Sequence, residues 1–270
     1  MITLLPRSGR MMAALVAEME RVKVADKKIG ILTDGLNDPG GQVADQLQRQ
    51  LEQRGHKVVY RGQLSDDIPT ASSQTPVEVN RMRTAGGTGA EVVVFLSGNS
   101  VFGTQFVNAA NGQNYRPIYV NSDWASNNGD TNNANMPASY EGAIGFTFNR
   151  GQSSKKFLPP TAPARRCQAI YDAKSGRKLK PEGNAEFGLT MSYCDDVRIF
   201  ELLATRAGPQ LTRDRFIAAR ASIGAFDSAS LSSGSLSAEK SDMADQVRTQ
   251  RWEAGCKCWG VVDGFHRPGG

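Results

Sequence analysis

The side chains best suited to chemistry come directly after three apolar segments of the sequence. They are carboxylates, an amide, a hydroxyl and one indole, namely Asp34, Asp38, Asn99, Ser100, Asp123 and Trp124. If the three segments are parallel strands, these side chains meet at one edge of a sheet, because the carboxyl ends of parallel strands share an edge. Such a mixture suits a small polar solute held in a cleft. Each acid taken alone is explained equally well as a helix cap or a turn residue.

Catalytic and cofactor-binding patterns are missing from the sequence. The two histidines, His56 and His266, stand in polar or terminal contexts, so neither a histidine base nor a histidine-rich metal site is expected. The segment 33–41, TDGLNDPGG, has neither the G-x-G-x-x-G spacing of a dinucleotide site nor the G-K-[ST] ending of a P-loop. We predict no catalytic residue, no cofactor and no metal. An α/β enzyme that uses Asp34 and Asp123 as acid and base is one alternative.

The four cysteines form the second informative set. Cys167 and Cys194 lie 27 positions apart in two predicted helices, and a disulfide between them would fit an oxidising compartment. Cys256 and Cys258 are separated by one residue, so they are free thiols, bond to each other in a distorted turn, or pair with the first two. A four-cysteine zinc site is disfavoured, because the sequence contains C-x-C and no C-x-x-C.

The composition excludes two further classes of protein. No stretch of the 270 residues approaches the roughly 18 apolar residues of a membrane span. The net charge of +5 comes from basic residues scattered among Pro, Ser and Gly without interleaved aromatics, so we predict no nucleic-acid partner. Charged residues at Arg7, Arg10 and Glu18 interrupt the apolar start of the chain, which predicts a helix there instead of a signal peptide.

Apolar runs alternate with helical patterns over the first half of the chain. Runs of this length indicate parallel strands buried on both faces, since a strand with one wet face would alternate in polarity. We predict an α/β fold with a doubly wound, parallel five-stranded sheet in 1–148, a linker over 149–162, and a helical part with terminal strands over 163–270. The predicted strands are 27–34, 56–62, 91–98, 117–123 and 142–148, with further strand over 251–265. The predicted helices are 9–24, 40–54, 75–85, 102–113, 163–173, 184–207 and 212–223, and the Ser-rich segment 228–237 is predicted to be a mobile loop.

Long parts of the sequence resemble a known family. The parts are KKIGILTDGLNDPGGQVADQLQRQLEQRGHKVV at 27–59, VNRMRTAGGTGAEVVVFLSGNSVFGTQFVNAANGQNYRPIYVNSDW at 79–124, EGAIGFTF at 141–148 and YCDDVRIFELLATRAGPQLTRDRFIAARASIGAF at 193–226. Together they resemble the second lobe and the closing helices of type I periplasmic substrate-binding proteins, in the leucine/isoleucine/valine-binding branch that serves ABC transporters.

The resemblance implies a non-enzymatic function. Members of the family close two lobes around a small solute and deliver it to a membrane permease, which implies a periplasmic or cell-surface location. Asp123 falls where amino-acid-binding relatives pair an acid with the ligand ammonium. Asn99 or Ser100 falls where they place an aromatic side chain, and Asp38 falls where they often have tyrosine. These departures leave the ligand open among amino-acid-like solutes, amides and short-chain acids.

The resemblance also implies that half of the cleft precedes this sequence. The family begins with a complete first lobe, whereas this chain starts near the crossover into the second, so we expect an N-terminally truncated binding protein. The helices of 163–223 would then lack their usual partner, and self-association is expected through the apolar face of Phe187, Met191, Cys194, Val197 and Leu202. The alternative from a third class is a stand-alone ligand-sensing α/β regulatory domain.

Overall fold

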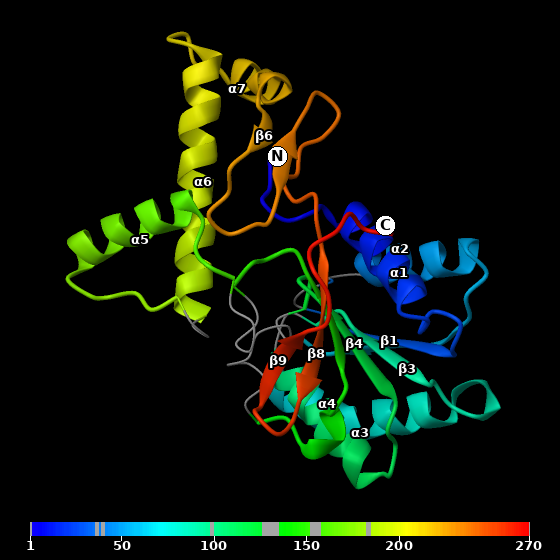
Figure 1. The fold of residues 1–270 in the computed structure, drawn as a ribbon. Helices are drawn as coiled ribbons and strands as arrows, with labels where there is room; N and C mark the ends of the chain where they lie inside the picture. The colour runs from blue at the N-terminus through cyan, green and yellow to red at the C-terminus, as the bar shows by residue number, and fades with distance from the viewer. Residues whose placement is uncertain are drawn as a thin grey trace.

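A seven-stranded sheet is the centre of the protein, with strand order β2-β1-β3-β4-β5-β8-β9 (Figure 1). The structure is a computed structural model that describes residues 2–35, 38, 41–97, 100–125, 135–151, 158–181 and 185–269. The first five strands are β1 (Ile29–Asp34), β2 (Val58–Leu64), β3 (Val92–Phe95), β4 (Ile118–Ser122) and β5 (Ile144–Thr147), and they run parallel. Every residue of β1, β3 and β5 is buried, as a sheet covered on both faces requires, so the predicted parallel sheet is confirmed.

Two strands from the end of the chain extend this sheet, which corrects the predicted count of five strands. β8 (Arg248–Glu253) pairs antiparallel with β5, and β9 (Cys258–Val261) pairs with β8. The sequence prediction assigned these terminal strands to the second part of the chain. The burial of β8 explains the error, because its first three residues, Arg248, Thr249 and Gln250, are polar and yet fully buried. A polar strand gives no apolar run by which its position in the core could be predicted.

Helices cover both faces of the sheet. α1 (Ser8–Arg21) and α2 (Gln42–Gln53) lie on one face, and α3 (Ile68–Thr84) and α4 (Ser100–Gly112) lie on the other. The alternation of side chains along β3 shows the division, since Val92 and Val94 join the core under α1 while Val93 and Phe95 join the core under α3 and α4.

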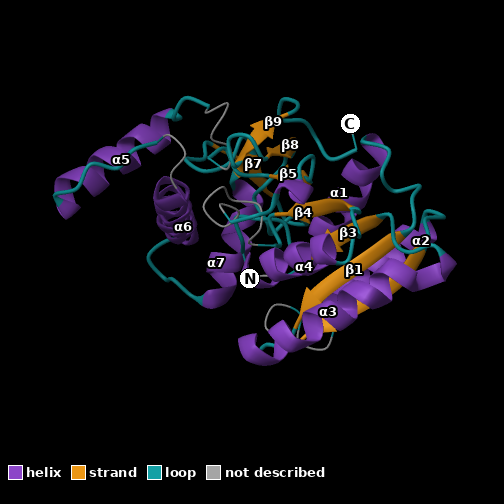
Figure 2. Cartoon of the chain, turned by 90° about the horizontal axis from the view of Figure 1, so that it is seen from below, coloured by secondary structure: helices purple, strands orange, loops and turns teal. Residues whose placement is uncertain are grey.

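The second part of the chain stands beside the sheet in both views (Figures 1 and 2). It consists of α5 (Ala162–Ser175), α6 (Ala185–Ala207), α7 (Arg213–Ala219) and a hairpin of β6 (Gly224–Phe226) and β7 (Gly234–Leu236). The predicted disulfide is confirmed: Cys167 of α5 and Cys194 of α6 are bonded, with their Cα atoms 6.2 Å apart. None of the helices in the described ranges is long and apolar enough to cross a lipid bilayer.

The Ser-rich segment 228–237 packs around a buried carboxylate and contains β7, where the sequence predicts a loop throughout. Asp195 of α6 has no solvent exposure. Its oxygens accept hydrogen bonds from the Ala229 amide at 2.9 Å, the Ser230 hydroxyl at 2.8 Å and the Arg198 guanidinium at 2.8 Å. A buried charge is tolerated when its hydrogen-bonding capacity is met in this way.

The apolar face of α6 that was expected to lack a partner is partly buried and partly exposed. Phe187 and Met191 are buried in a cluster with α5, and only Val197 of the expected set is more than half exposed. The apolar stripe that α6 presents to solvent is instead Leu189, Tyr193, Val197 and Phe200, with 58–68% exposure.

Candidate functional site

The predicted site residues that the structure describes lie along the carboxyl edge of the parallel sheet. Asp34 is the last residue of β1, and Asp123 and Trp124 follow β4 directly. β3 lies between those two strands, so the two acids are about 10 Å apart across the sheet. Asn99 lies outside the described residues, and Ser100, of which only the backbone is described, begins α4 at the same edge.

Asp38 holds the N-terminus of α2. Its carboxylate is buried, and its two oxygens accept hydrogen bonds from the amides of Val43 at 2.8 Å and Ala44 at 2.9 Å. These amides belong to the first turn of the helix, where no carbonyl within the helix can accept from them. The negative charge also lies at the positive end of the helix dipole. The contacts of Asp38 are therefore those of a capping residue.

Asp123 joins the ends of β4 and β5. Its Oδ2 accepts hydrogen bonds from the Phe148 amide at 2.7 Å, the Thr147 hydroxyl at 3.1 Å and the Asn149 side-chain amide at 3.2 Å. One oxygen of this carboxylate is thus fully engaged by the strand that leads out of the site. The expected bond to a ligand ammonium would depend on the other oxygen.

A buried arginine beside this acid was not predicted from the sequence. Arg248 opens β8 opposite Thr147, donates a hydrogen bond to the Arg150 carbonyl at 3.0 Å and lies 4.8 Å from the ring of Phe265. Burial lowers the pKa of Arg248 to about 10, and the attraction of Asp123 opposes that change. The guanidinium therefore remains charged at neutral pH and balances Asp123. Nothing in the segment RTQRWE distinguishes this arginine from a surface residue.

Trp124 and Asn121 face opposite sides of the sheet. The indole of Trp124 is partly buried against the core under α1. Asn121 is fully buried and donates a hydrogen bond to the Tyr140 hydroxyl at 2.7 Å, and burial raises the pKa of that hydroxyl above its ordinary value. Of the two, Trp124 is the residue that remains partly accessible at the sheet edge.

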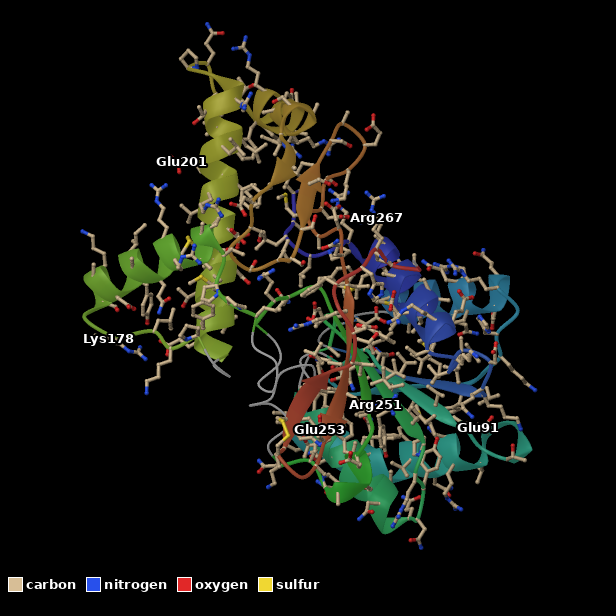
Figure 3. All side chains as sticks on the ribbon, viewed as in Figure 1. Glu91, Lys178, Glu201, Arg251, Glu253 and Arg267 are labelled. Carbon is tan, nitrogen blue, oxygen red and sulfur yellow. A yellow bond between two sulfur atoms is a disulfide. The ribbon has the colours of Figure 1, made fainter. Side chains whose placement is uncertain are left out.

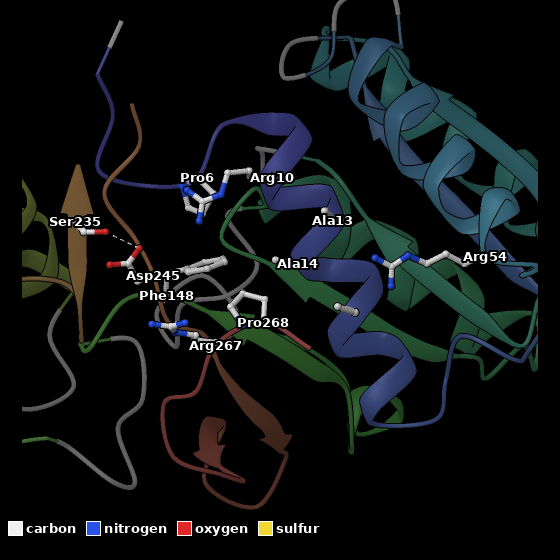
Figure 4. A pocket seen from close by; sticks show the side chains of 11 residues that line it. Pro6, Arg10, Ala13, Ala14, Arg54, Phe148, Ser235, Asp245, Arg267 and Pro268 are labelled. Atoms are coloured by element: carbon white, nitrogen blue, oxygen red, sulfur yellow. Dashed lines mark hydrogen bonds between the residues drawn. The ribbon is translucent and has the colours of Figure 1, made fainter. Parts of the chain in front are cut away.

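A separate pocket of about 580 Å³ opens along α1 (Figure 4). Its lining includes Pro6, Arg10, Ala14, Asp245, Arg267 and Pro268. Arg10 forms an ion pair with Asp242 and donates to the Ala244 carbonyl at 3.2 Å, while Asp245 forms an ion pair with Lys240 at 3.0 Å. The charged groups of Arg10 and Asp245 are therefore engaged within the chain, as those of Asp38 and Asp123 are at the sheet edge.

Metal binding receives no support from the described residues. Within them, no group of three or more His, Cys, Asp or Glu side chains could hold a metal ion.

Comparison with known proteins identifies the fold. No protein-family model and no curated protein sequence matches this chain. Among solved structures, a branched-chain amino acid ABC transporter protein from Thermus thermophilus with bound valine aligns with a TM-score of 0.72 and 14% identity, over 98% of this chain and 67% of its own. The leucine binding protein LivK from Thermotoga maritima aligns with a TM-score of 0.68 and 14% identity, over 97% of this chain and 66% of its own.

A third neighbour has a different ligand. It is a solute binding protein of an ABC transporter from Rhodopseudomonas palustris in complex with p-hydroxybenzoic acid, with a TM-score of 0.68 and 14% identity, over 96% of this chain and 65% of its own. A fold shared at this identity leaves the solute undetermined. The chain has the fold of the type I periplasmic solute-binding proteins of ABC transporters, and it spans about two thirds of the length of these neighbours.

Proposed function

We propose that this protein is the solute-binding component of an ABC import system. The observation that carries the proposal is the alignment of nearly the whole chain, 98%, on a solute-binding structure with a TM-score of 0.72. A binding role needs no general base and no metal, which agrees with a site made of carboxylates, an indole and backbone amides.

The proposed solute site is the carboxyl edge of β1, β3 and β4. Its proposed contact residues are Asp34, Asp38, Asn99, Ser100, Asp123 and Trp124. The hydrogen bonds of Asp38 and Asp123 within the chain favour a positioning role for these two acids, since each holds a segment that borders the site. The proposed solute is small and polar, either amino-acid-like, an amide or a short-chain acid.

Calorimetric titration tests the proposed function. The folded chain, alone and as part of a longer protein that supplies a first lobe, is titrated with branched-chain amino acids, hydroxybenzoates, amides and short-chain acids. We expect at least one solute to bind the longer protein without turnover and to bind the present chain more weakly, because the proposed cleft needs a second lobe. The absence of binding to a folded longer protein would overturn the proposal.

A stand-alone sensing domain is the second candidate, and one observation favours it. The C-terminal strands β8 and β9 complete the sheet within this chain, so the α/β unit has its own closed core. If this candidate is correct, the present chain binds its ligand as tightly as the longer protein does. No observation favours the enzyme that would use Asp34 and Asp123.

The proposed partner is a membrane permease and the proposed location is the periplasm or the cell surface. The disulfides support this location, because such bonds persist in oxidising compartments. Alkylation of intact cells before lysis tests it, with both pairs expected to resist the reagent until a reductant is added. Self-association through α6 stays a prediction that none of the comparisons supports.

A further inference from the structure

The hairpin of β8 and β9 carries a second disulfide at its tip. Cys256 and Cys258 are bonded, with their Cα atoms 5.2 Å apart and one residue, Lys257, between them (Figure 3). The tip lies at the amino ends of the parallel strands, because the Gly142 amide donates to the Trp252 carbonyl at 3.0 Å. The candidate solute site lies at the carboxyl ends of these strands, so the two sites are at opposite ends of the sheet.

The two cysteines differ in their solvent exposure. Cys256 is exposed, whereas Cys258 is 5% exposed and lies in β9 beside the buried ring of Trp259. A thiol in solution can therefore reach Cys256, and Cys258 is the sulfur that would leave. The disulfide between α5 and α6 lacks this asymmetry. Cys167 is 4% exposed in the apolar cluster between the two helices, and Cys194 packs against that cluster.

The residue between the two cysteines has an unusual backbone conformation. Lys257 has a φ of +50°, in the left-handed region that residues other than glycine, asparagine and aspartate rarely adopt. Its two neighbours in the chain are the bonded cysteines, and its amide donates a hydrogen bond to the Ala254 carbonyl at 3.3 Å within the hairpin turn. The tip therefore has a turn conformation that glycine would adopt more readily than lysine.

The charge at the tip also favours exchange. Lys257 is exposed and is the neighbour of both cysteines in the chain, and a cation close to a cysteine stabilises its thiolate. Glu253, which pairs with Cys258 across the hairpin, opposes this effect from the other strand.

We propose that Cys256–Cys258 is a thiol–disulfide exchange site that accepts two electrons from an external dithiol. A thiolate of the dithiol attacks Cys256 Sγ, a mixed disulfide forms there, and the bond to Cys258 breaks with its electron pair on Cys258 Sγ, which then takes a proton from water. The second thiol of the donor then attacks the donor sulfur of the mixed disulfide, and Cys256 Sγ leaves with the electron pair of that bond and takes up the proton that this thiol releases. The products are the cyclic disulfide of the donor and the Cys256 and Cys258 thiols.

Timed reduction of the native full chain tests the proposal. The oxidised protein is incubated with dithiothreitol, quenched with acid, and labelled with one alkylating reagent before full reduction and with an isotopic form afterwards. We expect Cys256–Cys258 to be reduced at least about tenfold faster than Cys167–Cys194 in the folded protein. Equal rates, or faster reduction of the helical pair, would overturn the proposal.

Variants of the hairpin tip test the roles of Cys256, Cys258 and Lys257 one at a time. With oxidised glutathione, Cys258→Ser should form a mixed disulfide at Cys256 at least about tenfold faster than Cys256→Ser forms one at Cys258. Lys257→Gly accommodates the positive φ and removes the charge, so its disulfide should be reduced several-fold more slowly, while Lys257→Arg should match the native rate. Equal reactivity of the two serine variants would contradict attack at Cys256.

Discussion

At the scale of single residues, carboxylates that the sequence presents as surface groups are the anchors of the structure. Asp195 joins α6 to the segment 228–231, Asp38 holds α2, and Glu18 of α1 accepts hydrogen bonds from His266 at 3.0 Å and from the Gly269 amide at 3.2 Å. Asp195 and Glu18 have no solvent exposure and Asp38 has 1%. Removing such a group leaves several donors unpaired in the core, which costs more than the loss of one exposed hydrogen bond.

Asp195→Asn should lower the free energy of unfolding by about 3 kcal/mol, because the amide nitrogen would face amide and hydroxyl donors in a buried site. The neighbouring acid, Asp196, is exposed and provides the control. Asp196→Asn should change stability by less than about 0.5 kcal/mol. Urea denaturation of the two variants measures the difference, and equal midpoints would refute the role given to Asp195.

Asp38→Ala should cost about 1 kcal/mol of stability through the lost cap of α2. Asp38→Asn keeps one acceptor and should cost less. If Asp38 also contacts solute, Asp38→Asn should lower the free energy of solute binding by more than it lowers the free energy of unfolding. Parallel calorimetry and denaturation of both variants distinguish capping from ligand contact.

The contribution of Glu20 to the stability of the fold depends on pH. A hydrogen bond from His56 at 2.8 Å, helped by Arg54, holds the pKa of Glu20 below its ordinary value of 4.5. Its contribution to stability is therefore complete above pH 4.5 and is lost as the pH falls through the lowered pKa. Because the Glu20 side chain is 34% exposed and its ion pairs are screened by solvent, Glu20→Gln should reduce the stability difference between pH 7 and pH 3 by only about 0.5 kcal/mol. Urea midpoints at both pH values measure it, with Glu52→Gln as the control; an unchanged difference would contradict the pairing.

At the scale of elements, helix α6 has two apolar sides, of which one is buried and the other is exposed to solvent. One side packs on α5 through Phe187 and Met191, and the other presents the stripe of Leu189, Tyr193, Val197 and Phe200 to solvent. Four large apolar side chains at helical spacing are more than an isolated exposed residue, and such patches promote association. The stripe is therefore the surface at which association of this chain is to be tested.

Val197→Glu should abolish any concentration-dependent association of the chain and leave its unfolding midpoint unchanged, because Val197 is 66% exposed. Thr205→Glu, on the same helix and away from the stripe, is the matched control. Sedimentation velocity over a range of concentrations measures the association. An associating Val197→Glu variant would show that the stripe is not the contact.

The sequence predicted where the strands and helices lie, but it did not predict the polar burial that places β8 in the sheet and Asp195 in the core. β1 and β3 are buried on both faces and read as apolar runs, so their positions were found within a few residues. β8 has buried arginine, threonine and glutamine, and Asp195 is an acid in a long helix; both patterns are normally typical of a surface. That the site residues share one edge of the sheet could be predicted, because they follow parallel strands. The hydrogen-bond partners of Asp38 and Asp123 could not be predicted, because they depend on how the folded segments contact one another.

At the scale of the whole molecule, the two ends of the chain are joined. α1 begins at the eighth residue and is tied through Glu18 to the last residues, and β8 completes the sheet beside β5, about 100 residues earlier in sequence. The core on the α1 side of the sheet continues into α6 and α7 through Ile199, Leu203 and Ala219. A change at either terminus should therefore affect the stability of both parts together.

The antiparallel pairing of β8 on β5 has a consequence for the synthesis of the protein. Until residues 248–253 leave the ribosome, β5 is the outer strand of the sheet, with one row of backbone donors and acceptors unpaired. The α/β part must wait for more than a third of the chain to be made before this edge is covered. During that interval the exposed strand edge is open to aggregation or to binding by a chaperone.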